Sequence, residues 1–333
     1  MNKMNWHFVD DKYTFLLPDP GRQSYLYFPL VNEGGLVAVV TPTLHGDIKA
    51  GQNRFLTLPV SVEDLHISRA ARNFWVHVAG HGAWSATGNS ARQIAQHFVA
   101  EDAEQVELRA GFLWQQVTRR NLALGLEAEI TSFVPSGEDL PPEASSVELM
   151  RVVLANVGSA PLTLTPTAAV PIFGRSADRA RDHRHVTSLL HRIATHPYGV
   201  VVRPTLTFDE RGHRFNTVTY AVLGAEGDGT APVAVFPTLE TFVGPGGSLD
   251  WPQAVVEPGL TGLAAGRRLA GYEAMGGLRF GRITLDPGQR CAYVLALGIL
   301  DDDEDPEAIM ARYGDDARFE AWLTRTKTHW DQK

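Results

Sequence analysis

The stretch VELMRVVLANVGSAPLTLT, residues 147–165, contains two candidate strands around a turn. Its first arm alternates apolar and polar residues before it becomes fully apolar, and its last four residues alternate Leu with Thr. Successive side chains of a strand point to opposite faces, so this alternation indicates strands that place one face on a core. The Asn, Gly and Pro residues between the arms favour a turn. The stretch therefore predicts β-structure that is buried on at least one side.

The same arrangement of apolar runs around a turn recurs along the chain. It is found at 25–30 and 36–40, at 199–203 and 214–220, and at 278–285 and 292–300. The 31 Gly and 20 Pro residues punctuate these runs. Strands and helices do not alternate as in a parallel sheet, and no repeat of fixed period is present. The chain is therefore predicted to be mainly β, as a large antiparallel sandwich.

The C-terminal segment has a different pattern, which begins at the acidic run 301–305. Asp305 can cap a helix, and Pro306 and Glu307 suit its first turn. After a break at Gly314, five residues fall on one helical face: Phe319, Trp322, Leu323, Thr326 and Trp330. We expect a sandwich domain at 1–300 and a helical linker at 301–333. The aromatic face is expected to dock either on this sandwich or on a following domain.

Composition limits the classes of function. Hydrophobic residues make up 44% of the chain and charged residues 20%, as in ordinary globular proteins. The net charge of −8 argues against a nucleic-acid partner. No secretory signal and no apolar run of about 18 residues is present, so we expect a cytoplasmic protein with no membrane partner. The lone cysteine, Cys291, lies in a predicted strand and is interpreted as a small buried hydrophobe.

The densest polar cluster is 174–192, which holds five Arg, two Asp and three His. Guanidinium and carboxylate groups suit the hydroxyls of a carbohydrate, or an anion. A zinc site at His183 and His185 would lack a firm third ligand. Asp178 and Asp182 are too close in sequence to flank one glycosidic bond as a catalytic pair. A network of Arg–Asp pairs that pins a long loop is the structural alternative.

The segment 73–89 supplies a second group of candidates. Tryptophan rings stack on sugars, because a sugar ring offers apolar C–H edges. Trp75 alternates as a strand residue and is expected in the core, whereas Trp84 lies among Gly and Ser and is the candidate for an exposed ring. The chain contains no G-x-S-x-G, P-loop or H-E-x-x-H motif, so we predict no catalytic residue and no metal site.

Several short segments together resemble the N-terminal domain of glycoside hydrolase family 94, formerly glycosyltransferase family 36. They are PLVN (29–32), GDIK (46–49), FLTLPVSVEDL (55–65), RNFW (72–75), WSATG (84–88), RDHRHVTS (181–188) and GGSLDWP (246–252). The resemblance runs from about residue 13 to the end of the chain. It is closest to the β-1,2-oligoglucan phosphorylases and to the related domain of cyclic β-1,2-glucan synthases.

The resemblance implies a galactose-mutarotase-like β-supersandwich, C-terminal linker helices and then a catalytic (α/α)6 barrel. The barrel, which carries the general acid in this family, is expected to lie outside this chain. The chain alone should then be inactive, although the full enzyme would cleave β-linked gluco-oligosaccharides with inorganic phosphate as co-substrate and with no cofactor. The resemblance further implies contacts with the barrel and with a second copy in a homodimer.

Substrate-binding residues are expected in a loop of the sandwich that helps to shape the sugar subsites. The matching loop residues are Arg181, Asp182, His183, Arg184 and His185, and Trp84 is added from the aromatic group. Two alternatives stay open: a stand-alone carbohydrate-binding module, and an aldose-epimerase-like enzyme. An epimerase needs a His acid and a carboxylate base in one pocket, for which His191 or His213 with Glu129 could be considered.

Overall fold

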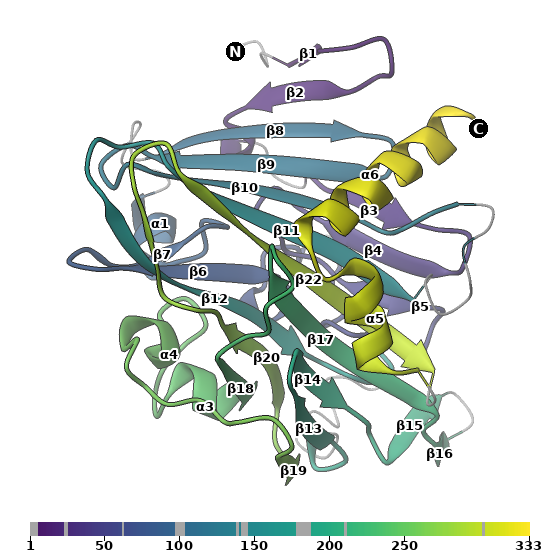
Figure 1. The fold of residues 1–333 in the computed structure, drawn as a ribbon. Helices are drawn as coiled ribbons and strands as arrows, with labels where there is room; N and C mark the ends of the chain where they lie inside the picture. Colours follow the sequence, from purple (N-terminus) through teal and green to yellow (C-terminus); the bar gives the residue numbers. More distant parts are fainter. Residues whose placement is uncertain are drawn as a thin grey trace.

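Strands with alternating burial form two antiparallel layers, a large sheet covered on its inner face by smaller ones (Figure 1). A computed structural model describes residues 6–22, 26–61, 63–96, 104–137, 140, 146–177, 188–209, 212–301 and 304–333. Within these residues the strands are joined mostly in antiparallel ladders. The pairings of the central strands show this arrangement. The predicted mainly β antiparallel sandwich is confirmed.

The larger sheet has 11 strands within the described residues. Their order is β1 (His7–Phe8), β2 (Phe15–Pro18), β8 (Gln105–Gly111), β9 (Trp114–Asn121), β10 (Leu126–Phe133), β11 (Val147–Asn156), β22 (Arg290–Asp301), β17 (Val218–Glu226), β14 (Gly199–Val202), β13 (Arg192–His196) and β19 (Arg268–Ala270). Residues distant in the chain thereby become neighbours, since β11 pairs with β22 and β22 pairs with β17.

Three smaller sheets contain the other strands of the described residues. The six-stranded sheet contains β18 (Ala234–Thr238), β20 (Ala274–Arg279), β12 (Leu162–Ile172), β6 (Asn73–Val78) and β7 (Gly82–Ser85), with β21 (Ile283–Leu285) paired to β12. The three-stranded sheet contains β3 (Phe28–Val31), β4 (Leu36–Val40) and β5 (Ile48–Ala50). The third smaller sheet is a hairpin of β15 (Leu206–Asp209) and β16 (Gly212–Phe215).

The main core lies between the layers and is built from one face of each central strand. On β22 the residues Tyr293, Leu295 and Leu297 point into it, whereas Val294 and Ala296 belong to a second core on the outer face. The same division holds on β17. Strands buried on both faces lose the apolar–polar alternation, which explains the continuous apolar run of residues 291–300.

The outer face of the large sheet is covered by α5 (Pro306–Tyr313) and α6 (Asp316–Asp331), which cross it in Figure 1. Asp305 caps α5 with Pro306 in the first turn, as predicted, and α5 ends at Gly314. Phe319 and Leu323 of α6 are buried in the second core. Of the two expected docking surfaces, the helices therefore use this chain's own sandwich.

Short helices cover the outer face of the six-stranded sheet. Trp75 is fully buried there beneath α3 (Leu239–Val243) and α4 (Gln253–Val256), as expected for a core residue. Other short helices among the described residues are η1 (Pro20–Arg22), η2 (Ser68–Ala70) and α1 (Ala91–Gln96). No helix in the described part of the chain is both long and apolar enough to cross a membrane.

Two of the predicted turns connect different partners from those that the sequence suggests. The turn at 156–161 carries the chain from β11 in the large sheet to β12 in the six-stranded sheet. The turn at 209–212 closes the separate β15–β16 hairpin, and β14 pairs instead with β17. The alternation of apolar and polar residues predicts where these strands lie in the sequence. Their pairing depends instead on which sheet buries the apolar face of each strand.

Candidate functional site

Five segments that are distant in sequence meet where the three-stranded and six-stranded sheets adjoin. We call this region the junction and define it as residues 41–49, 55–57, 70–73, 85–90 and 173–175. Backbone hydrogen bonds tie its segments together: Gly46 N to Ala70 O (3.0 Å), Arg72 N to Leu44 O (2.9 Å), Leu56 N to Ile48 O (2.9 Å) and Phe173 N to Leu56 O (2.7 Å). The junction thus collects parts of most of the motifs noted in the sequence.

An ion pair with no exposed side-chain surface connects the junction to β11 of the large sheet. The Nε atom of Arg72 lies 2.7 Å from Oε1 of Glu148, and Arg72 Nη2 donates to Glu148 Oε2 at 2.8 Å. Arg72 also donates to the backbone oxygens of Gly46 and Asp47. Burial raises the pKa of Glu148, and the adjacent guanidinium opposes that rise. One arginine therefore joins the 44–47 loop to β11 of the large sheet.

Two further ionisable groups are buried beside this pair. His45 is 6% exposed and its Nδ1 lies 2.9 Å from the Thr43 hydroxyl. Burial, followed by the charges of His66 and Arg72, lowers the pKa of His45 to about 3, so the ring is neutral at physiological pH. Burial also raises the pKa of Asp47, whose carboxylate accepts a long hydrogen bond from Val60 N. These groups serve packing within the junction rather than contact with solvent.

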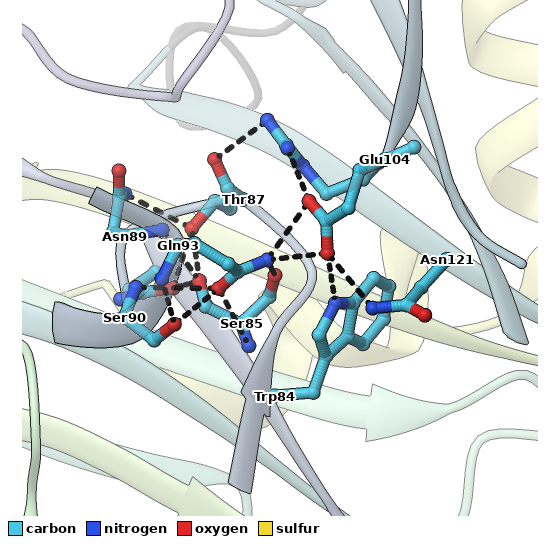
Figure 2. Close-up of polar contacts among 10 residues, drawn as sticks. Trp84, Ser85, Thr87, Asn89, Ser90, Gln93, Glu104 and Asn121 are labelled. Carbon is cyan, nitrogen blue, oxygen red and sulfur yellow. Dashed lines mark hydrogen bonds and ion pairs between the residues drawn. The ribbon is translucent and has the colours of Figure 1, made fainter. Parts of the chain in front are cut away.

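Trp84 differs from its prediction. Its side chain is 4% exposed and forms part of the main core, so the expectation of an exposed ring is wrong. Figure 2 shows its Nε1 donating to Glu104, at 2.6 Å. Glu104 also receives Arg119 Nη1 at 2.6 Å and the Gln93 and Asn121 side-chain amides. Alternation on β7 turns Trp84 inward, and Gly and Ser neighbours in the sequence do not reveal that direction.

A second network of short polar side chains fixes the segment that follows Trp84 (Figure 2). Asn73 accepts hydrogen bonds from the hydroxyls of Ser85 and Thr87. Asn89 Nδ2 then donates to Thr43 O at 2.9 Å, which connects this segment to the 41–49 loop. All of these side chains are nearly fully buried and hydrogen-bonded, so they stabilise one backbone arrangement.

The predicted substrate-binding loop begins directly beyond the junction. Arg181, Asp182, His183, Arg184 and His185 lie outside the described residues, as do the Asp178–Asp182 pair and the alternative zinc ligands. The residues on either side of the loop are described. Arg175 pairs with Phe55 and its guanidinium lies 4.1 Å from the Phe173 ring centroid. The loop thus starts from a fixed strand end.

His191, which follows the segment that contains the predicted loop, is buried next to Gly174, which precedes it. A Cβ atom on Gly174 would lie 3.5 Å from Nε2 of His191, which is 3% exposed. Burial and then the charge of Arg175 lower the pKa of His191 to about 4. Gly174 and His191, which flank the segment that contains the predicted loop, therefore lie next to each other.

A family model described as "Glycosyl hydrolase 94, supersandwich domain" matches residues 54–316. This chain belongs to glycosyl hydrolase family 94. The match includes most of the junction, the segment 174–192 and the beginning of α6. The resemblance noted in the sequence is therefore confirmed at the level of the family.

Three solved structures are similar to this chain at low sequence identity and low TM-score. A bacterial glucoamylase complexed with acarbose is 8% identical with a TM-score of 0.46 over 93% of this chain, and a putative kojibiose phosphorylase from human microbiome is 7% identical with a TM-score of 0.38 over 96%. This chain spans 37% of the glucoamylase chain and 35% of the putative kojibiose phosphorylase chain. A putative aldose 1-epimerase from Escherichia coli K12 is 9% identical, with a TM-score of 0.33, over 83% of this chain and 99% of its own. No curated protein matches the sequence.

The family 94 supersandwich does not bring together the residues considered for an epimerase. Glu129 lies on β10 and His191 directly precedes β13, with four strands of the large sheet between them. At about 4.8 Å per strand the two are roughly 24 Å apart, which is too far for one pocket. His213 lies on the exposed β16 hairpin. Among the described residues, no group of three or more His, Cys, Asp or Glu could hold a metal ion.

Sequence reasoning missed the residues that build the junction. Arg72 and Gly46 occur in the RNFW and GDIK motifs, but nothing in those motifs identifies Glu148 as the partner of Arg72, 76 positions later. A charged residue within the apolar stretch 147–154 was the available signal, since a buried carboxylate requires a partner. Cys291 was better assigned: it is half-buried against the main core, and burial raises the pKa of its thiol.

Proposed function

We propose that this chain is the supersandwich part of an inverting glycoside phosphorylase that acts on β-linked gluco-oligosaccharides, with β-1,2 as the preferred linkage. The observation that carries the proposal is the family 94 match over residues 54–316. In this role the sandwich helps to shape the sugar subsites and supports a separate catalytic barrel. A barrel and a second copy of the chain are the proposed protein partners, and the cytoplasm is the proposed location.

The geometry of the junction supports a positioning role. Its ionisable groups contact one another and the backbone, so they hold loops instead of reacting with a substrate. Arg181, Asp182 and His183, with Arg184 and His185, are then the proposed sugar-contacting groups on a loop with a fixed base. Their donors and acceptors suit sugar hydroxyls. Residues 1–300 would form the sandwich domain, and 301–333 the linker to the barrel.

Reconstitution tests this proposal. The purified chain is incubated with β-1,2-gluco-oligosaccharides and inorganic phosphate, with and without a separately produced family 94 barrel, and release of sugar 1-phosphate is measured. We expect no turnover by the chain alone and measurable turnover when the barrel is added. Phosphorolysis by the isolated chain would contradict the proposed division of labour.

Variants of the loop separate a substrate role from a scaffold role. In the reconstituted enzyme, Arg181→Gln with Arg184→Gln should raise KM for the oligosaccharide about tenfold or more, because each charge-assisted hydrogen bond is strong. Arg109→Gln, on an exposed position of β8, is the matched control and should leave KM unchanged. Tryptophan fluorescence measures oligosaccharide binding by the chain alone. If the chain binds oligosaccharide but supports no turnover with any barrel, it is a carbohydrate-binding module instead.

A further inference from the structure

A groove of about 590 Å³ lies on the outer face of the six-stranded sheet, beside the region that α3 and α4 cover. His77 on β6, Thr163 and Thr165 on β12, and Arg279 and Arg282 line it. His77 pairs with Thr165 across the two strands. Asn73, at the other end of β6, belongs to the junction, so the groove is about 13 Å along the strand from it. The groove is thus a separate site from the junction.

One wall of the groove is fixed in place before any ligand binds. This wall is the segment 258–264, and Leu263 exchanges backbone hydrogen bonds with Val235 of β18, at 2.7 and 3.2 Å. Arg279 donates to the backbone oxygens of Leu260 and Ala254 and lies over the Phe236 ring. A Cβ on Gly262 would be 2.8 Å from Val235 O, so the wall packs closely on the strand. A preformed wall reduces the entropy lost on binding.

The charge of the groove is opposite to that of the chain. The chain has a net charge of −8, yet the lining holds His77, Arg279 and Arg282, and no described acidic residue lines it. The Arg279 guanidinium already donates to the backbone oxygens of Leu260 and Ala254. The side chains of Arg282 and His77 make no hydrogen bond or ion pair with any other described residue. The Arg282 guanidinium, the His77 imidazole and the Thr165 hydroxyl can each donate a hydrogen bond into the groove, and no described carboxylate lines the groove with them.

We propose that this groove binds a phosphate-bearing small molecule, with Arg282 as the forked donor and with His77 and the Thr165 hydroxyl as the additional donors. Guanidinium groups bind phosphate oxygens in pairs, which suits Arg282. The volume lies in the range of small-molecule pockets and exceeds the needs of a bare ion, so a sugar phosphate fits it. This inference goes beyond the proposed function and does not depend on it.

Binding should be linked to protonation of His77. Burial, followed by the charges of Arg282 and Arg279, lowers the pKa of His77 in the free chain. These two arginines are the charged groups that face it, because its strand partners Thr165 and Ala83 and the segment 258–264 carry no titratable side chain. A bound phosphate favours the imidazolium, so it raises the pKa of His77 and binds more tightly at pH 6 than at pH 8.

The test follows the imidazole resonances of His77 by NMR while inorganic phosphate, glucose 1-phosphate or glucose is added to the chain. Both phosphate-bearing ligands should give a saturable shift and raise the pKa of His77, and glucose should give neither. A tighter response to glucose 1-phosphate assigns the sugar phosphate as the ligand, and an equal response assigns inorganic phosphate. No saturable shift at millimolar ligand, or the same shift with glucose, would overturn the proposal.

Two variants add an independent measurement. Arg282→Gln should weaken phosphate binding at least about tenfold, since it removes a charge-assisted pair of hydrogen bonds. Arg268→Gln, at an exposed position of β19, should bind like the parent chain. The ligand-induced rise in Tm should disappear in the first variant and persist in the second. Equal binding by both variants would show that Arg282 does not hold the ligand.

Discussion

At the scale of single residues, the junction depends on side chains that are small or fully paired. Gly46 has a φ of +132°, and a Cβ atom there would lie 1.9 Å from Val39 O. The same turn gives its backbone oxygen to Arg72. Glycine is thus required by a contact with the backbone of β4, and its neighbours in sequence do not disclose that contact.

Gly46→Ala should therefore lower the free energy of unfolding by about 3 kcal/mol or more, because backbone strain and a clash with Val39 act together. Gly35→Ala is the matched control: its φ is also positive, at +90°, but no atom lies within 4 Å of the added Cβ. The free energy of unfolding of that control should fall by only about 1–2 kcal/mol. Urea unfolding measures both, and equal losses would show that the close approach does not matter.

At the scale of elements, α6 illustrates how far a helical pattern can be read. The periodic spacing predicts that five residues share one buried face: Phe319, Trp322, Leu323, Thr326 and Trp330. Phe319, Leu323 and Thr326 are buried, whereas Trp322 and Trp330 are only half-buried. The pattern did not specify the surface that receives this face. Phe319 packs edge-to-face on Phe133 with ring centroids 5.1 Å apart, and Thr326 accepts a hydrogen bond from Ser136 N. Each partner lies more than 180 residues before the α6 residue that it contacts.

Phe319→Ala should cost about 3–5 kcal/mol of unfolding free energy, as expected for the loss of a fully buried aromatic side chain. Thr328→Ala lies on the exposed side of the same helix and should change stability by less than about 0.5 kcal/mol. Thermal unfolding of the two variants gives the comparison. A small effect of Phe319→Ala would mean that α6 does not depend on the large sheet.

At the scale of the whole molecule, burial of histidines couples folding to pH. His45 lies in the junction and His191 lies next to Gly174 at its edge, and both are nearly fully buried with a strongly lowered pKa. A histidine that stays neutral in the fold but takes up a proton in the unfolded chain stabilises the fold above its unfolded pKa of 6.5. That stabilisation is lost as the pH falls through 6.5 toward the folded value.

From pH 7 to pH 5 each of the two histidines should remove about 2 kcal/mol of unfolding free energy, or about 4 kcal/mol together. His191→Gln should show a pH dependence that is smaller by about 2 kcal/mol over the same interval, whatever its stability at pH 7. His81→Gln, at an exposed turn, is the control and should keep the parent slope. Urea titrations at the two pH values measure the difference, and identical slopes would contradict the assignment.

The sequence by itself determined the strands, the turns, the helix caps at 305–307 and the family, because alternation, turn chemistry and short motifs are local properties. Only the tertiary structure decided which strands pair, where Trp84 points, that Arg72 meets Glu148, and which surface receives α6. Those outcomes depend on contacts between residues separated by tens to hundreds of positions. The fold also places a groove lined by two arginines on a chain of net negative charge, and the net charge alone does not reveal that groove.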